Sequence, residues 1–210
     1  AFDSTVNLYA LELWSASVRK ITPAGVVTTL AGSGSAAVTN GTGAAASFDR
    51  PRKLALITSN LIAVADYYGS AVRLVTYPGG VVTTLASGFS GCPGVAVDPT
   101  AGNIIATDQN NGTVNLVTYP GGSKSIIAGG GGSFADGTGT SAKFYYPYGV
   151  NVSPTGVIAI GDFNNHRIRL SSSAAAGVVT TLAGQTTAGS ADGTGAGASF
   201  SQPDGVAMLS

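Results

Sequence analysis

The chain has 210 residues, which is enough for one domain with a substantial apolar core. Its ten Lys and Arg balance its ten Asp and Glu, and only Arg50, Arg52 and Lys53 cluster, so we expect no nucleic-acid partner. No apolar run reaches the roughly 18 residues of a membrane-spanning helix and no signal-peptide pattern opens the chain, so we expect no direct membrane insertion and a signal peptide that was removed or lies upstream.

The chain begins with short apolar segments that are separated by turn residues. We predict strands at residues 8–13, 18–21 and 26–30, because Val, Ile and Thr favour strands while Gly, Pro, Asn and Asp favour turns. Residues 1–5 align with residues 96–100, where a later repeat has its first strand. The chain is therefore expected to start inside the first strand of a four-stranded antiparallel sheet.

The strand that closes this first sheet recurs along the chain. Its last apolar residue returns at steps of 55, 42 and 55 residues, as Leu30, Leu85, Ile127 and Leu182. An acidic residue stands 18 to 20 residues before each of these positions, as Glu12, Asp66, Asp108 and Asp162. Periods of about 40 to 55 residues with four strands per unit are typical of β-propellers. The predicted fold class is therefore all-β.

The last complete repeat carries the motifs of a known family. Asn165-His166-Arg167-Ile168 follows Gly161-Asp162, segments of the type Pro-x-Gly-Val occur at residues 147–152 and 203–207, and the related Pro-Gly-Val-Ala-Val occurs at residues 93–97. This pattern resembles the NHL repeat over nearly the whole chain. The resemblance implies a single propeller domain over residues 1–210, with blades at residues 1–32 plus 203–210, 51–86, 93–128 and 147–183. Only one copy keeps the His, so the multi-histidine metal site of the family's amidating lyase is not implied.

Two arrangements of the blades stay open at this point. Residues 203–210 align with a first strand, four repeats after the start of the chain. This strand either completes the first blade and closes a four-bladed ring, or the chain is part of a larger propeller, for example one with six blades.

Three connections between the predicted blades carry the same Gly-rich insertion. In each, Asn/Asp-Gly-Thr-Gly stands 8 residues before a Phe, and the three Phe are Phe48, Phe144 and Phe200. This constant spacing predicts one defined loop conformation, with the Phe buried between adjacent blades. Calcium needs about six to eight oxygen ligands, whereas each loop offers at most one carboxylate and the first offers Asn40 instead. We therefore predict structural turns and no metal.

Few residues along the chain suggest chemistry. Asp66, Asp108 and Asp162 end predicted second strands, and we expect them to accept backbone N–H bonds rather than to line a central opening. The single histidine, His166, and the single cysteine, Cys92, are interpreted as a hydrogen-bonding turn residue and a small buried side chain. Because no catalytic triad, nucleophile elbow or phosphate-binding loop occurs, we expect no catalytic residue, no cofactor and no enzymatic activity.

Asn40, Asn111 and Asn151 match the acceptor pattern of N-glycosylation. Asn40 and Asn111 lie in predicted turns, whereas Asn151 lies inside a predicted strand and is the poorest candidate. These sequons favour an extracellular or cell-surface location.

Tyrosines concentrate in predicted turns and loops. Five of them form a candidate interaction surface: Tyr77, Tyr119, Tyr145, Tyr146 and Tyr148. Packing between loops would explain the same residues equally well.

The function predicted from these features is that of a non-catalytic structural and protein-interaction propeller module in a larger extracellular protein. Its partners would be other proteins, copies of itself in a fibrous surface assembly, or glycans. Two alternatives stay open. One is a metal-dependent lyase or lactonase whose ligands lie partly outside this segment, and the other is the ligand-binding ectodomain of a receptor.

Overall fold

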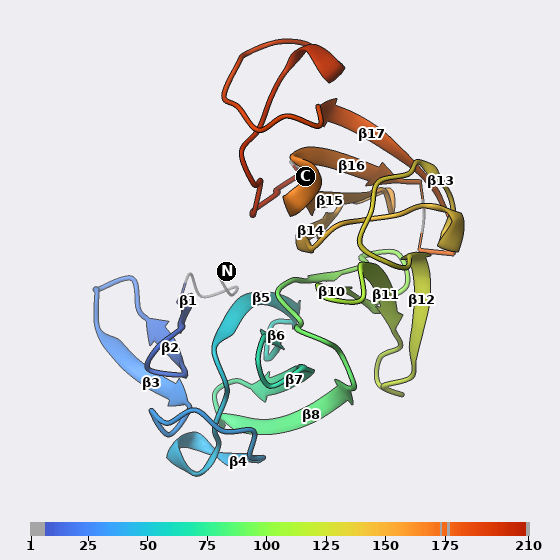
Figure 1. Ribbon diagram of the computed structural model, residues 1–210. Coiled ribbons are helices and arrows are strands. Elements are labelled where there is room, and N and C mark those ends of the chain that lie inside the picture. The colour runs from blue at the N-terminus through green and yellow to red at the C-terminus, as the bar shows by residue number, and fades with distance from the viewer. Residues whose placement is uncertain (1–6, 173, 176, 209–210) are drawn as a thin grey trace. The chain divides into compact units, whose positions relative to one another are not determined.

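The computed structural model describes residues 7–172, 174–175 and 177–208, which form antiparallel β-sheets joined by turns and loops (Figure 1). The described residues contain four sheets and group into two compact units, residues 1–95 and 96–210. The prediction of an all-β chain with four antiparallel sheets is confirmed.

The first unit contains two sheets. The first sheet has the order β1 (Leu8–Glu12), β2 (Ser17–Ile21) and β3 (Val27–Ala31). The second sheet has the order β5 (Pro51–Thr58), β6 (Leu61–Asp66), β7 (Ala71–Thr76), β8 (Val81–Ser87) and β4 (Gly41–Thr42). Strand β4 is a two-residue addition from the Gly-rich loop, which the sequence analysis did not predict.

The second unit also contains two sheets. The third sheet has the order β9 (Val95–Val97), β10 (Ile104–Asp108), β11 (Thr113–Val117) and β12 (Lys124–Gly129). The fourth sheet has the order β14 (Pro147–Val152), β15 (Ile158–Asp162), β16 (Arg167–Ser171), β17 (Val178–Gly184) and β13 (Gly137–Thr138). Short 3-10 turns complete the described structure: η1 (Gly43–Ala45), η2 (Gly139–Ser141), η3 (Phe163–Asn165) and η4 (Gly195–Gly197).

The burial of each strand follows its place in the sheet. The inner strands β10 and β15 are buried at every residue, which explains why they read as continuous apolar runs. The outer strands β8 and β17 share the sequence Val-Val-Thr-Thr-Leu-Ala, and burial alternates along most of their length. Their second valines, Val82 and Val179, point into the core and are fully buried, while the first threonines face solvent.

All four sheets share one irregularity, in the pairing of β3, β8, β12 and β17 with β2, β7, β11 and β16. The register shifts between Val18 and Arg19, Val72 and Arg73, Val114 and Asn115, and Ile168 and Arg169. Each shift leaves one extra residue in the later strand: Leu30, Leu85, Ile127 and Leu182. Such a bulge bends the strand and increases its local twist. The turn before β2, β7, β11 and β16 contains a residue with positive φ: Ala16, Ser70, Gly112 and His166.

The predicted role of the loop phenylalanines is confirmed for two of them. Phe48 is fully buried in a core formed by the first and second sheets, and Phe144 is fully buried in a core formed by the third and fourth sheets. Phe200 in the third loop is only partly buried. Cys92 is buried, as expected.

Among the residues described above, none of the helices has the length and apolarity that crossing a membrane would require.

Candidate functional site

The most elaborate polar site occurs twice and is built around a buried arginine. Arg73 on β7 and Arg169 on β16 have fully buried side chains. Arg73 donates from Nη1 to Asp66 Oδ2 at 3.1 Å, and Arg169 donates from Nη1 to Asp162 Oδ2 at 2.7 Å. Each arginine lies seven residues after its aspartate. We call the Asp66–Arg73 and Asp162–Arg169 pairs the loop clamps, because both hold the Gly-rich loop that precedes their sheet.

The first loop clamp binds its loop through the other donors of Arg73. Nη1 donates to the Ser47 carbonyl at 3.1 Å, and Nη2 donates to the Thr39 carbonyl at 3.0 Å and to Asn40 Oδ1 at 2.9 Å. The free oxygen of the carboxylate is also used, because Asp66 Oδ1 accepts the Asp49 N–H at 2.7 Å. Strand and loop are therefore held together by charge-assisted hydrogen bonds.

The second loop clamp repeats this geometry. Arg169 donates to the Lys143 carbonyl at 3.0 Å, to the Ala135 carbonyl at 2.7 Å and to Asp136 Oδ1 at 2.6 Å. Asp162 Oδ1 accepts the Tyr145 N–H at 2.9 Å. Asp136 takes the place of Asn40, so this loop contributes a second carboxylate to the arginine.

Burial governs the electrostatics of the two clamps. It raises the pKa of Asp66 to about 6, against the opposing effects of the Asp49 N–H and the Arg73 charge. Burial likewise raises the pKa of Asp162, against hydrogen bonds from Asn165 and Tyr145 and the charge of Arg169. The arginine charge and the loop N–H favour the ionised form of each buried carboxylate, and they therefore limit how far burial raises its pKa.

The fully buried arginine occurs in the two sheets that a Gly-rich loop precedes. At the equivalent position of the third sheet stands Asn115, and the connection before that sheet lacks the Gly-rich insertion. There Asp108 accepts a hydrogen bond from Asn111 Nδ2 at 3.1 Å. The first sheet has a clamp-like pair, Glu12 and Arg19, at 3.0 Å, but these side chains are 38% and 29% exposed. Hydrogen bonds from Ser17 and Arg19 lower the pKa of Glu12.

Asp66 and Asp162 each accept a backbone N–H, as predicted. The donor belongs to the preceding loop and not to the following turn. The arginine partner was missed. Its signal in the sequence is the constant interval of seven residues between the acidic position and Arg19, Arg73 or Arg169.

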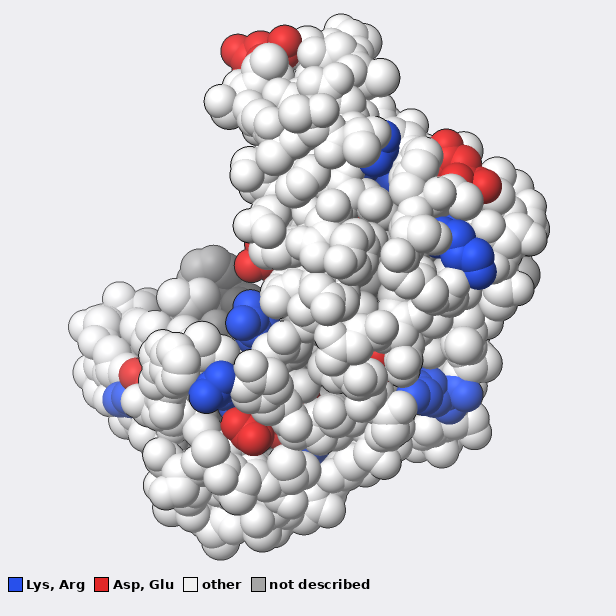
Figure 2. Space-filling view, viewed as in Figure 1, with Lys and Arg blue, Asp and Glu red and all other residues white. Residues whose placement is uncertain are grey.

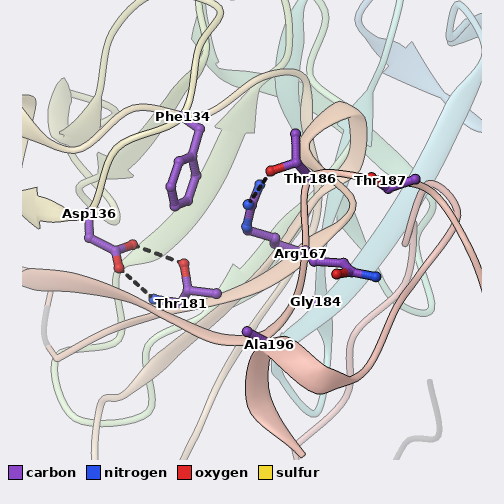
Figure 3. A pocket seen from close by; sticks show the side chains of 9 residues that line it. Phe134, Asp136, Arg167, Thr181, Gly184, Thr186, Thr187 and Ala196 are labelled. Carbon is purple, nitrogen blue, oxygen red and sulfur yellow. Dashed lines mark hydrogen bonds between the residues drawn. The ribbon is translucent and has the colours of Figure 1, made fainter. Parts of the chain in front are cut away.

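A hollow of about 400 Å³ opens beside the second clamp (Figure 3). The Arg167 guanidinium lies 4.0 Å from the Phe134 ring centroid and donates to Thr186 Oγ1 at 2.9 Å. Asp136 accepts hydrogen bonds from the N–H and the hydroxyl of Thr181, at 3.2 and 3.1 Å. Arg167 is thus paired with Thr186, and Asp136 is paired with Thr181. We therefore interpret the hollow as the solvent-facing side of the second loop clamp.

The predicted tyrosine surface is only partly exposed. Tyr148 is 8% exposed and its ring stacks on Phe163 with centroids 4.5 Å apart, so it does not lie on the surface. Tyr77 is half-buried, packs edge-on against Tyr9 and accepts a hydrogen bond from Lys20 at 2.7 Å. Tyr119 and Tyr146 are half-buried, and Tyr145 is exposed. Packing explains Tyr77 and Tyr148.

The structure shows a different aromatic surface in the first unit. Trp14 is 76% exposed and Tyr68 is 52% exposed. The Arg50 guanidinium lies 4.8 Å from the Trp14 ring centroid and 4.4 Å from that of Tyr68. We call these three residues the Trp14–Arg50–Tyr68 stack. It was not predicted from the sequence.

The asparagine side chain of each of the three sequons forms a hydrogen bond. Asn40 Oδ1 accepts from Arg73, Asn111 Nδ2 donates to Asp108, and Asn151 Oδ1 accepts the Met208 N–H. Glycosylation of these residues stays a prediction. His166 Nδ1 accepts the Gln202 N–H at 3.1 Å. Within the described ranges, no cluster of three or more His, Cys, Asp and Glu is placed to hold a metal ion.

No known protein family and no curated protein matches the sequence. Solved structures do share the fold. An auxiliary nutrient binding protein from Bacteroides ovatus superposes over 99% of this chain and 52% of its own, with a TM-score of 0.74 and 16% identity. Virginiamycin B lyase from Staphylococcus aureus superposes over 87% and 53%, with a TM-score of 0.62 and 13% identity. A chain of a nidogen/laminin complex gives 86% and 77%, a TM-score of 0.53 and 16% identity.

These likenesses show a β-propeller-like fold. This chain spans about half the length of the first two structures. They also correct one expectation. The prediction that the chain is not an enzyme is overturned, because similar structures include a lyase. The missing sequence motifs therefore do not exclude catalysis for this fold.

Proposed function

We propose that this chain is an NHL-type propeller module that makes protein–protein contacts within a larger extracellular protein. The observation that carries the proposal is the exposed Trp14–Arg50–Tyr68 stack. Trp, Tyr and Arg are the residue types that dominate binding energy at protein interfaces. A tryptophan this exposed contributes little to folding, so its large apolar ring is available to a partner.

The stack is held in a fixed conformation before any partner arrives. Arg50 has a φ of 53°, and the residue before it donates its N–H to the buried Asp66 carboxylate. The guanidinium in turn makes cation–π contacts with both rings. Little conformational entropy is lost when a partner binds such a preorganised group.

Charge supports contact with proteins rather than with a polyanion. Figure 2 shows Lys and Arg as separate blue groups on the face in view, some of them beside red Asp or Glu. A net charge of +0 leaves little repulsion between copies, and this suits a fibrous surface assembly. The sequons support an extracellular location.

The test begins with chemical cross-linking of the chain in the extracellular fraction of its source, with partners identified by mass spectrometry. The affinity of the purified partner is then measured for the wild-type chain and for Trp14→Ala and Tyr68→Ala. We expect each substitution to weaken binding by about tenfold or more. Tyr145→Ala, an exposed tyrosine outside the stack, is the control and should bind normally. Unchanged affinity of both stack variants would overturn the proposal.

A further inference from the structure

The first sheet has fewer strands than its counterparts. Among the described residues it contains β1, β2 and β3, whereas the second and fourth sheets contain five strands each. In those sheets one additional strand lies beside the second strand of the blade, as β5 and β14. The other is the two-residue strand on the outer edge, as β4 and β13. Within residues 7–208, as far as the structure describes them, no strand takes either position in the first sheet.

Both positions coincide with hollows. One, of about 260 Å³, lies along β1 and is lined by Tyr9, Ala10, Leu11, Arg52, Lys53 and Leu54. The other, also of about 260 Å³, lies at the Glu12–Arg19 pair and reaches Thr29 on β3. Glu12 and Arg19 are partly exposed, whereas the corresponding pairs of the two occupied clamps are fully buried. In the part of the chain that the structure describes, no Gly-rich loop covers the Glu12–Arg19 pair.

Residues 185–208 form no strand in the structure, but they contain residues that align with the two kinds of additional strand. Gly193-Thr194 aligns with the residues of β4 and β13, and Pro203 aligns with the first residues of β5 and β14. Between them, Phe200 aligns with the buried Phe48 and Phe144 but is itself only partly buried.

This segment already has the conformation of a clamped loop. The Ser199 N–H donates to the Ala191 carbonyl at 3.0 Å, as Ser47 does to Thr39 at 3.1 Å. Ser199 Oγ accepts the Ala191 N–H at 2.8 Å, as Ser47 Oγ accepts from Thr39 at 3.0 Å. The φ of Gln202 is 55°, against 53° and 57° at the two equivalent positions. Docking would require little reordering of the loop.

We propose that residues 185–208 of one copy dock on the first sheet of a second copy of this chain. Arg19 then donates to Asp192 and to the carbonyls of Ala191 and Ser199, as Arg169 does to its own loop. Glu12 accepts the Ser201 N–H, Gly193-Thr194 pairs with the start of β3, and Pro203 extends the sheet beside Glu12. This contact goes beyond the proposed function, because it is made by the Glu12–Arg19 pair and the edges of the first sheet rather than by the Trp14–Arg50–Tyr68 stack.

Two observations favour a second copy as the occupant. The chain carries both halves of the contact, and the same contact occurs twice within it, at the two occupied clamps. Asp192 and Arg19 are complementary in charge, as Asp136 and Arg169 are. Such a head-to-tail contact generates a closed ring or a filament.

The fluorescence of Trp14 can be used to follow the proposed contact. In the occupied clamps, the residue two positions after the aspartate donates its N–H to the loop: Tyr68 to the Asp49 carbonyl at 3.0 Å, and Asn164 to the Tyr145 carbonyl at 2.9 Å. Trp14 holds this position in the first sheet and is the single tryptophan of the chain. Docking of a loop beside it should shift its fluorescence emission to shorter wavelength.

The experiment compares the wild-type chain with Arg19→Glu, which disables the clamp, and with Asp192→Arg, which disables the loop. Mass is measured by sedimentation velocity across a concentration series, with Trp14 emission recorded on the same samples. We expect wild-type mass to rise with concentration as the emission shifts. Each variant alone should associate at least about tenfold more weakly. An equimolar mixture should regain association, because the loop of one variant meets the intact clamp of the other.

Three outcomes would overturn the proposal: a wild-type mass that stays monomeric, single variants that associate like wild type, and a mixture that does not regain association. A Trp14 shift that is independent of concentration would place the loop on its own chain instead. Circular dichroism checks that both variants fold, which is expected because Arg19 and Asp192 are exposed at least in part. Tyr68→Ala separates the two proposals, because it should weaken partner binding while leaving self-association intact.

Discussion

Arg169 and Asp136 form an ion pair of 2.6 Å across 33 positions of the chain, and the same place in the other clamp is filled by Arg73 and Asn40 at 2.9 Å. A carboxylate and an amide therefore serve the same arginine donor. What the two sites have in common is the fully buried Asp66 or Asp162, together with two loop carbonyls. The clamp consequently depends on the buried carboxylate more than on the exposed loop residue.

The first prediction concerns the buried arginine. Arg73→Ala should lower the free energy of unfolding by about 3–5 kcal/mol, because it leaves the Asp66 carboxylate buried without its charge partner. The partly exposed Arg19→Ala should cost less than about 1 kcal/mol. Urea denaturation of the two variants tests the difference. Equal losses would show that the Asp66–Arg73 clamp does not hold the fold.

A second prediction follows from the interchange of Asn40 and Asp136. Asp136→Asn should cost about 1 kcal/mol or less, since an amide oxygen can replace one carboxylate oxygen toward Arg169 and Thr181. Asp162→Asn should cost several times more, because it removes the fully buried carboxylate and leaves the buried arginine with only the partly exposed Asp136 as its charge partner. Thermal unfolding of both variants measures the ratio, and a larger loss in Asp136→Asn would contradict it.

The loop phenylalanines give a matched pair. Phe144→Ala should lower the free energy of unfolding by about 3–5 kcal/mol, because the ring fills a core between two sheets. Phe200→Ala removes the same ring from a partly buried place and should cost no more than half as much in the monomer. Chemical denaturation at low concentration, where copies stay apart, is the appropriate measurement. Similar losses would mean that Phe200 is already seated as Phe144 is.

The raised pKa of Asp66, about 6 against an ordinary 3.8, predicts how stability changes with pH. The folded chain holds this proton more tightly than the unfolded chain, so the stabilising contribution is complete below about pH 4 and is lost as pH rises through about 6. Asp162 acts in the same direction. Between pH 4 and 6 the free energy of unfolding should fall more steeply for wild type than for Asp66→Asn. Parallel profiles would refute this assignment.

Two glycines with similar backbones test close packing at the loops. Gly129 and Gly34 both have positive φ, 92° and 84°. A Cβ at Gly129 would collide with the Gly112 carbonyl and the Phe144 ring, whereas a Cβ at Gly34 would meet nothing within 4 Å. Gly129→Ala should therefore cost at least about 2 kcal/mol more than Gly34→Ala, which carries only the conformational cost. Comparable melting temperatures would argue against this packing.

The sheets could be predicted because their signals are local. Val, Ile and Thr alternate within strands, and Gly, Pro and Asn close them, so the four sheets and the buried Phe48 and Phe144 followed from spacing. The clamp could not be predicted in the same way, because Arg73 bonds to carbonyls 26 and 34 residues away. A backbone acceptor leaves no trace in the residue types of the loop.

Surface residues were predicted least well, and for a related reason. The sequence of a loop does not distinguish a tyrosine whose ring faces solvent from one whose ring packs on a neighbouring ring, as that of Tyr148 does. The exposure of Trp14 was not predicted, because a large apolar residue in a strand-rich chain is normally assigned to the core. Its exposure depends on which segment covers the turn, which is a tertiary property.

The buried arginines also decide how the glycine-rich loops would meet a protease. A segment rich in Gly, Ser and Thr is normally a site of easy cleavage, because its backbone can be drawn into an extended form. In the loops at residues 39–48 and 135–144, the carbonyls that a protease would need are held by Arg73 and Arg169. The loop at residues 191–199 has the same internal hydrogen bonds, but no arginine among the described residues of its own unit is seen to bind its carbonyls. Its resistance to limited digestion would therefore measure the fraction of molecules in which a clamp has bound this loop.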